Sequence, residues 1–180
     1  MAILAPADEA ECRALLQTAY EHTGPALVRY PRGSGPGTEP TADLSMLPWG
    51  QGEIRRSGTD VAILSFGALL DRALDLGDQL EATVANMRFV KPLDEALINQ
   101  LAAEHRVLVT LEENVVAGGA GSAVNELLLA AGYTGRVLNY GLPDQFIEQA
   151  TQQEQLEQAG LGVETLLAGI QQVLTESSAG

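Results

Sequence analysis

Two arginines stand close together where an apolar segment ends. Arg29 and Arg32 lie in the run Val28–Gly33, directly after Ala26 and Leu27. A guanidinium group presents a planar fork of N–H donors that binds a phosphate or a carboxylate through two hydrogen bonds. In a chain of net charge −14, this pair of cations predicts an anion-binding site, with Arg32 and Arg29 as substrate-binding candidates. The alternative is structural, with each arginine in a salt bridge to one of the many carboxylates.

A second group of candidates surrounds another apolar segment, Val107–Leu111. Glu112, Glu113 and Asn114 follow it, and the glycine-rich run Gly118–Ser122 precedes a helical pattern. Paired carboxylates at the end of a strand could transfer protons, and glycines at a helix start could admit an anion or dinucleotide. For the acids, capping or bonding to a partner subunit has equal weight. For the glycines we favour close helix packing or an interface turn, because the run is not a complete GxGxxG and no GxxxxGK[ST] occurs.

The remaining polar candidates are assigned structural roles. The segment Arg88–Asp94 contains two cations at a predicted strand-to-helix junction, and a turn held by salt bridges explains them best. His22 and His105 each close a predicted helix, where positive charge interacts favourably with the helix dipole. We therefore predict no catalytic residue, no cofactor-binding residue and no metal ligand within this chain.

Composition excludes several classes of function. The chain has 180 residues, 46% hydrophobic and 19% charged, which is typical of a globular protein. Its 10 basic and 24 acidic residues give a net charge of −14. This negative charge repels nucleic acids and anionic membrane surfaces. Cys12 is the only cysteine, which excludes an intrachain disulfide and a multi-cysteine zinc site. Because no signal-peptide pattern and no membrane-spanning apolar run occur, we expect a cytoplasmic protein.

The elements that must position these residues fall into two regions and a linker. Residues 1–33 predict the end of a buried strand, a helix over Glu9–Glu21 and a strand over Ala26–Tyr30. These elements cannot close a core of their own, so they predict the tail of a larger sheet. Residues 34–52 are rich in glycine and proline without periodicity and predict a linker, which Trp49 docks onto one of the domains.

The second region, residues 53–180, alternates strands with helices. Strands are predicted over Val61–Gly67, Ala82–Val90, Val107–Leu111 and Arg136–Tyr140, and helices over Ala68–Leu80, Leu93–His105 and Ser122–Ala131, with two closing helices after Thr151. Most of the strands are nearly continuous apolar runs. This pattern predicts an α/β fold with a mostly parallel sheet covered by helices on both faces, preceded by a partial βαβ unit.

Five segments together resemble the bacterial 1-deoxy-D-xylulose-5-phosphate synthase family. They follow one collinear order between Met1 and about Val173: Ala5–Arg13, Val28–Gly33, Met87–Asp94, Glu112–Ser122 and Asn139–Asp144. The combination is more specific than any single motif, and it corresponds only to the C-terminal part of those enzymes. The resemblance implies that residues 1–33 are the incomplete end of a pyrimidine-binding domain. Residues 53–180 resemble the transketolase-type C-terminal domain.

The resemblance also implies an activity for the complete enzyme. This transferase family condenses pyruvate with glyceraldehyde 3-phosphate and releases carbon dioxide, using thiamine diphosphate and magnesium. Its product feeds isoprenoid synthesis by the non-mevalonate route, and also thiamine and pyridoxal synthesis. In the family, the arginine of the Tyr-Pro-Arg-Gly segment contacts the phosphate of the acceptor substrate. By resemblance this role falls to Arg32, with Arg29 at the neighbouring position.

The match stops short of the family's cofactor machinery. The GDG…NN motif for magnesium and diphosphate is absent with its domain, and the activating glutamate and active-site histidines belong upstream of Met1. We therefore expect a fragment that is inactive alone and binds neither thiamine diphosphate nor magnesium. Its partners would be the remaining N-terminal and pyrimidine-binding domains, within a homodimer.

Three other interpretations stay open at this point. The chain could be the C-terminal portion of a transketolase or of a 2-oxoacid dehydrogenase β-type subunit, which share this domain. It could also be a free-standing dimerisation or regulatory module. A nucleotide-binding domain built on Gly118–Ser122 is the third, and it predicts a thermal shift with NAD or ATP.

Overall fold

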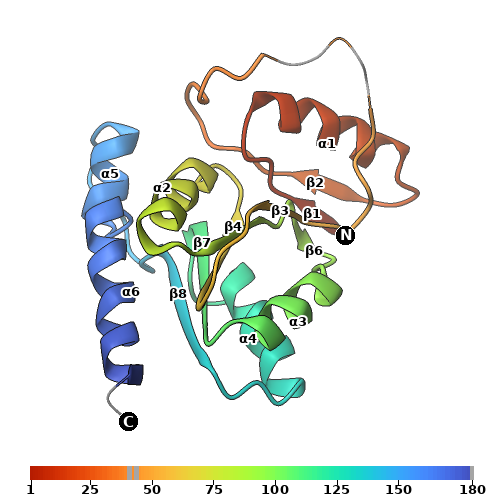
Figure 1. Ribbon diagram of the computed structural model, residues 1–180. Coiled ribbons are helices and arrows are strands. Elements are labelled where there is room, and N and C mark those ends of the chain that lie inside the picture. The colour runs from red at the N-terminus through yellow and green to blue at the C-terminus, as the bar shows by residue number, and fades with distance from the viewer. Residues whose placement is uncertain (40–41, 43–44, 179–180) are drawn as a thin grey trace.

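The structure is a computed structural model that describes residues 1–39, 42 and 45–178 (Figure 1). Helices and strands alternate through most of the chain. In chain order they are β1 (Ala2–Leu4), α1 (Glu9–Glu21), β2 (Ala26–Val28), β3 (Glu53–Arg56), β4 (Val61–Phe66), α2 (Leu70–Leu80), β5 (Thr83–Asn86), β6 (Phe89–Lys91), α3 (Glu95–Glu104), β7 (Val107–Val115), α4 (Ala120–Ala130), β8 (Arg136–Leu142), α5 (Gln152–Gln158) and α6 (Val163–Ser178).

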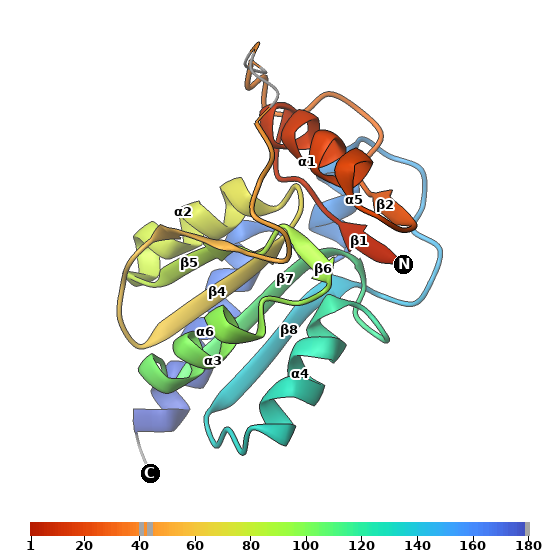
Figure 2. The ribbon, with the colours of Figure 1, turned by 90° about the vertical axis from the view of Figure 1, so that its right-hand side faces the viewer.

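The larger sheet confirms the predicted fold class. Its five strands lie in the order β3-β5-β4-β7-β8, and the three pairs β5–β4, β4–β7 and β7–β8 are parallel. One face packs against α2, α5 and α6, and the other against α3 and α4. Figure 2 shows α3 and α4 in front of this sheet and α6 behind it. The antiparallel edge strand β3 was not predicted, because its polar sequence Glu53–Arg56 carries no apolar pattern.

A smaller sheet of three strands joins the first region to the second. Its order is β2-β1-β6, with β1 parallel to β2 and antiparallel to β6. The prediction of one strand over Ala82–Val90 is therefore wrong. The chain leaves the larger sheet after Asn86, and Arg88 takes a left-handed backbone conformation with φ of 57° before β6 begins. An apolar run does not show this turn, because residues on both sides of it are buried.

Side-chain caps set the starts of three helices. Asp8 accepts a hydrogen bond from the Glu11 N–H at 2.7 Å, and Asp94 accepts one from the Leu97 N–H at 2.9 Å. Thr151 and Glu154 form a reciprocal capping box at the start of α5. Such caps satisfy N–H groups that the first helical turn leaves without partners, and each is worth about 1 kcal/mol.

The linker lies along α1 where the structure describes it. Trp49 stacks on His22 with ring centroids 3.8 Å apart and meets the edge of Phe89 at 5.4 Å, which confirms the predicted docking role. The Leu47 N–H donates to the Thr18 hydroxyl at 2.9 Å. Residues 40–41 and 43–44 of the predicted linker lie outside the described residues. In the described part of the chain, no helix combines the length and apolarity needed to span a membrane.

Candidate functional site

The arginine segment follows β2 and lies against the carboxyl ends of β4 and β7. The Arg29 N–H donates to the Leu4 carbonyl at 2.8 Å, which extends the pairing of β2 with β1 by one residue. The half-buried Arg29 side chain donates to the main-chain carbonyl of Glu113 at 3.4 Å. A recess of about 90 Å³ at this contact is lined by Arg29, Tyr30, Pro31, Phe66, Gly67, Ala68 and Glu113. The carboxyl edge of a parallel sheet is where α/β proteins bind ligands.

Arg32 lies three residues further along this segment and is exposed. Among the described residues, no carboxylate forms an ion pair with Arg32 or with Arg29. The salt-bridge alternative therefore does not describe either arginine, since Arg29 bonds to a carbonyl and Arg32 has no carboxylate partner there. Anion binding by Arg32 and Arg29 stays a prediction that this arrangement permits.

A large groove opens beside the same segment. It has a volume of about 1190 Å³ and lies between α1, the segment after Tyr30, the start of α2 and the start of α5. Arg72 at its wall is committed elsewhere, because its guanidinium donates to the Leu161 carbonyl at 2.6 Å and pairs with Glu157 at 3.3 Å. Burial raises the pKa of the Cys12 thiol, and the nearby Asp8 and Glu9 carboxylates raise it further. A raised pKa keeps this thiol protonated near neutral pH and makes it a poor nucleophile.

Glu112 caps α4 from within the sheet. Its side chain is buried, and its two oxygens accept hydrogen bonds from the Ala120 and Gly121 N–H groups, each at 2.9 Å. A carboxylate at this place satisfies N–H groups and complements the helix dipole. The capping interpretation is therefore confirmed for Glu112. The N–H groups that a nucleotide phosphate would need are already bonded within the chain.

The glycines of this turn serve close packing, as favoured from the sequence. A Cβ atom on Gly119 would lie 2.6 Å from the Glu112 carboxylate oxygens. A Cβ atom on Gly121 would lie 2.6 Å from the Thr110 hydroxyl and 2.7 Å from the Asn139 amide nitrogen. Both contacts are shorter than a side chain tolerates, so the helix reaches its carboxylate cap only with glycine at these positions.

Glu112 and Glu113 do not form a catalytic pair. Successive residues of a strand point to opposite faces of the sheet. The Glu112 carboxylate lies under α4, whereas Glu113 accepts a hydrogen bond from Gln152, at the start of α5, at 3.4 Å. The third residue, Asn114, donates to the Val115 carbonyl at 3.5 Å. These three side chains therefore make hydrogen bonds that hold α4, the start of α5 and the end of β7 in place.

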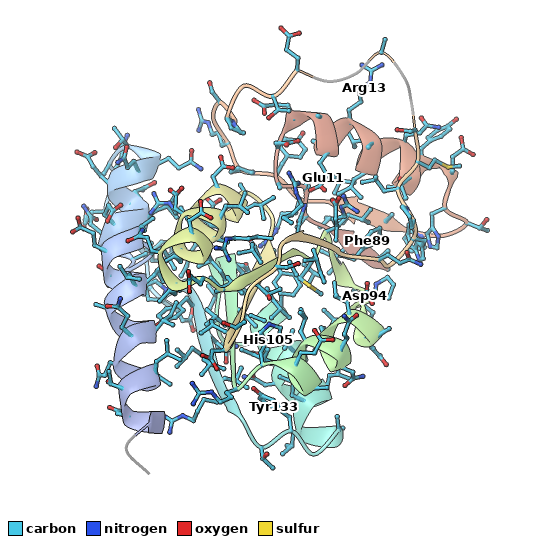
Figure 3. All side chains as sticks on the ribbon, viewed as in Figure 1. Glu11, Arg13, Phe89, Asp94, His105 and Tyr133 are labelled. Atoms are coloured by element: carbon cyan, nitrogen blue, oxygen red, sulfur yellow. The ribbon has the colours of Figure 1, made fainter. Side chains whose placement is uncertain are left out.

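The Arg88 junction is held by ion pairs, as predicted for Arg88, whereas the second cation, the exposed Lys91, has no carboxylate partner among the described residues. Arg88 donates to Glu11 at 2.7 Å and also pairs with Glu53, and the Arg88 and Glu11 side chains are only 12% and 9% exposed. Glu11 also accepts hydrogen bonds from the Asn86 amide at 2.8 Å and from the Ala7 N–H at 2.7 Å. Figure 3 shows Glu11 on the inner side of α1, opposite Arg13. The sequence did not reveal Glu11 as the partner, because 77 positions separate it from Arg88.

Both histidines make contacts that stabilise the fold. Both follow the last residue of a helix as its C-cap. The ring of His105 is buried between the Leu101 carbonyl at 2.9 Å and the Thr83 hydroxyl at 2.8 Å. His22 is engaged by stacking on Trp49.

The residues present do not fit thiamine diphosphate and magnesium. Within residues 1–39, 42 and 45–178, no three His, Cys, Asp or Glu side chains gather closely enough to hold a metal ion. The glycine-rich helix start, which resembles an anion site in sequence, is filled by Glu112. No catalytic step is therefore assigned to this cofactor within this chain.

The fold and these junctions define a transketolase-type α/β domain preceded by a βαβ unit. Residues 50–166 match the family described as the C-terminal domain of transketolase, and the chain belongs to this family. Its curated relatives all belong to one kind of enzyme within this family. The chain is 55% identical over 174 residues to the 1-deoxy-D-xylulose-5-phosphate synthase of Methylobacillus flagellatus, covering 97% of this chain and 28% of that enzyme. It is 57% identical over 171 residues to the synthase of Vibrio parahaemolyticus, with 93% and 28% covered.

The resemblance seen in the sequence is thus confirmed, and the chain spans about 28% of the length of these relatives. Two solved transketolase structures share the fold of this chain. A structure described as a split gene transketolase, an inactive beta4 tetramer, superposes with a TM-score of 0.86 at 34% identity, covering 97% of this chain and 58% of that one. The Campylobacter jejuni transketolase superposes with a TM-score of 0.61 at 17% identity over 95% of this chain and 26% of that one, which shows a shared fold.

Proposed function

We propose that this chain acts as the C-terminal part of a 1-deoxy-D-xylulose-5-phosphate synthase. The complete enzyme would condense pyruvate with glyceraldehyde 3-phosphate to 1-deoxy-D-xylulose 5-phosphate and carbon dioxide. The observation that carries this proposal is the 55% identity to named synthases over 97% of the chain. Thiamine diphosphate and magnesium would be held by the part of the enzyme that this chain does not contain. Phosphorylated substrates suit a cytoplasmic enzyme, because such anions do not cross membranes unaided.

Within that enzyme, Arg32 would bind the phosphate of the acceptor substrate. Its exposed guanidinium has no carboxylate partner among the described residues, and it lies on the segment held at the carboxyl edge of the sheet. Arg29 contributes less directly, since one of its donors is engaged by the Glu113 carbonyl. A charge-assisted contact of this kind is worth about 1.5–3 kcal/mol.

The chain alone would be a scaffold without turnover. Two observations support this part of the proposal: the chain spans 28% of the synthases, and the described residues offer no metal-binding cluster. The split gene transketolase, whose described form is an inactive beta4 tetramer, is a precedent for a chain of this kind that folds without activity. Homodimer formation is proposed for the complete enzyme on the same family grounds.

The test compares this chain with a complete synthase of which it forms the C-terminal part. Both are given thiamine diphosphate, Mg²⁺, pyruvate and glyceraldehyde 3-phosphate, and deoxyxylulose phosphate is measured by mass spectrometry. We expect product from the complete enzyme and none from the chain alone. Turnover by the isolated chain would contradict the scaffold role, and a complete enzyme that releases no carbon dioxide from pyruvate would contradict the synthase.

A transketolase is the second candidate, favoured by the TM-score of 0.86 with the split gene transketolase. The two reactions differ in the donor, because a transketolase transfers a two-carbon unit from a ketose phosphate and releases no carbon dioxide. Supplying the complete enzyme with fructose 6-phosphate or pyruvate as donor, each with glyceraldehyde 3-phosphate as acceptor, separates them, because a transketolase would then form erythrose 4-phosphate and xylulose 5-phosphate. Product from the ketose donor alone would select the transketolase.

A further inference from the structure

The segment between Arg29 and Gly33 has little support from backbone pairing. The Arg29 N–H donates to the Leu4 carbonyl at 2.8 Å, and in the described part of the chain no backbone hydrogen bond holds residues 30–33. Gly33 has a φ of 133°, which residues with a side chain rarely adopt. The placement of Arg32 therefore depends on side chains that contact this segment from outside.

Two contacts join the segment to the second region, and both involve Glu113. The Arg29 side chain donates to the Glu113 main-chain carbonyl at 3.4 Å. At the other end of the segment, a Cβ atom on Gly33 would lie 3.4 Å from the Gln152 side-chain oxygen, so the Gln152 amide lies directly against Gly33. The nitrogen of the same amide donates to the Glu113 carboxylate at 3.4 Å. Gln152 therefore bridges Glu113, near the end of β7, and Gly33.

Gln152 is carried by a helix that the second region holds in place. It is the first residue of α5, within the capping box that begins this helix. Leu156 of α5 is buried in the core that joins one face of the larger sheet to α2 and α6. Arg72 of α2 pairs with Glu157 of α5 at 3.3 Å. A side chain on such a fixed support can hold a segment that has few hydrogen bonds of its own.

We infer that Gln152 is a positioning residue for phosphate binding by Arg32. Its amide holds Gly33 next to Glu113, and this contact fixes the backbone one residue beyond Arg32. Without it, the segment would have to be ordered when the phosphate binds, and that ordering costs binding free energy. The inference rests on the proposed function, in which Arg32 binds the acceptor phosphate, and it adds a residue of the second region to that site.

Gln152→Ala in the complete synthase is the first test. We expect the KM for glyceraldehyde 3-phosphate to rise about three- to tenfold, as for the loss of one hydrogen bond, while kcat and the KM for pyruvate stay unchanged. Gln153→Ala is the matched control and is expected to change neither KM. Gln153 is the same residue type at the next position of α5, and within the described residues its side chain forms no hydrogen bond with Glu113.

Two variants of Glu113 separate positioning from a general loss of stability. Glu113→Ala removes the acceptor of the Gln152 amide and is expected to raise the KM for glyceraldehyde 3-phosphate as Gln152→Ala does. Glu113→Gln keeps a side-chain oxygen that can accept this hydrogen bond, so we expect a smaller rise than for Glu113→Ala. When both alanine substitutions are combined, the two increases should not multiply, because each removes the same contact.

Tryptic cleavage after Arg32 gives a readout that does not depend on turnover. In the isolated chain we expect Gln152→Ala to speed this cleavage at least about threefold, because a segment released from its support opens more often. Gln153→Ala is expected to leave the rate unchanged. Cleavage after Arg136, at the start of β8, reports global unfolding and is expected to be equal in all three chains.

The outcomes distinguish the inference from the proposed function. An active Gln152→Ala synthase with unchanged KM values and unchanged cleavage after Arg32 contradicts only the inference. Equal increases of both KM values, or faster cleavage after Arg136 as well, would show a general structural role and would also contradict it. A complete wild-type enzyme that forms no product contradicts the proposed function, whereas faster cleavage after Arg32 in Gln152→Ala still supports the positioning of this arginine.

Discussion

The turn before α4 and the segment after β2 both lie at the carboxyl edge of the larger sheet, but they differ in whether their charged group has a partner within the chain. At the first, the Glu112 carboxylate is buried and bonded to two N–H groups of its own chain. At the second, Arg32 is exposed and has no carboxylate partner in the described part of the chain. Polar groups that complete a fold are satisfied internally, whereas a charge with no internal partner is available to a ligand.

The same contrast separates the two regions as a whole. In the second region, helices cover both faces of the five-stranded sheet. In the first region, the βαβ unit keeps an open groove, an edge strand and exposed Leu16 and Tyr20. The second region thus covers its own sheet, whereas the first region leaves apolar and charged groups exposed, and the proposed phosphate-binding arginine lies there. Four predictions test this division, in order of decreasing effect.

Glu11→Ala breaks the contact between the two regions and has the largest expected effect. Removing this carboxylate leaves the Asn86 amide without its acceptor and leaves Arg88 with only the half-exposed Glu53, because both residues donate to Glu11. Loss of one member of a buried pair costs about 3–5 kcal/mol of unfolding free energy. Urea denaturation of the wild-type and variant chains measures this loss of unfolding free energy. An unchanged midpoint would mean that the regions are held together by apolar packing alone.

Glu112→Ala tests whether the Glu112 carboxylate stabilises the second region by capping α4. Two charge-assisted bonds to the start of α4 are lost, and we expect a destabilisation of about 2–3 kcal/mol. Glu112→Gln keeps an acceptor and is expected to lose less. A smaller loss for alanine than for glutamine, measured by thermal unfolding, would contradict the capping role.

Arg32→Ala in the complete synthase tests whether the unpaired guanidinium after β2 binds the substrate phosphate. Losing a charge-assisted contact of about 1.5–3 kcal/mol corresponds to an increase of roughly tenfold to hundredfold in KM for glyceraldehyde 3-phosphate. The KM for pyruvate and the unfolding free energy of the chain are expected to change little. Arg136→Ala, at another exposed arginine, is the matched control and leaves both KM values unchanged. Equal increases for the two substrates would contradict phosphate binding by Arg32.

Asp78→Ala has the smallest expected effect and calibrates the first prediction. Asp78 pairs with Arg56 at 2.8 Å, but its side chain is 77% exposed. Exposed ion pairs contribute about 0–1 kcal/mol, because water solvates both partners when the pair is broken. A loss as large as that of Glu11→Ala, by the same urea titration, would show that burial does not distinguish these pairs.

Much of the fold was predictable because its signals are local. Apolar runs such as Val107–Leu111 report burial on both faces of a parallel sheet, and Asp8 and Asp94 stand directly before the helices that they cap. The misplaced strand over Ala82–Val90 fails for a physical reason. A backbone that turns at Arg88 and enters a second buried sheet keeps the same apolar composition throughout.

The candidate site was predictable only in part. Arg29 and Arg32 stand out because they lie three residues apart directly after an apolar segment of an acidic chain. Glu11, Asn86 and Glu53 carry no such local signal, since each gains its role from partners that are distant in sequence. The large groove beside α1 was likewise not predicted, because its walls come from three stretches of chain: residues 6–36, 68–72 and 152–153.

By itself, the sequence determined the family resemblance, the mostly parallel sheet and the arginines at its edge, because residue type and periodicity encode them. Only the tertiary structure decided which charges are internal and which are open. It placed Glu112 on the helix start, Glu11 on Arg88, and no described carboxylate on Arg32. The pairing of a charge depends on which side chains the folded chain brings within hydrogen-bonding distance, and separation along the sequence does not encode that distance.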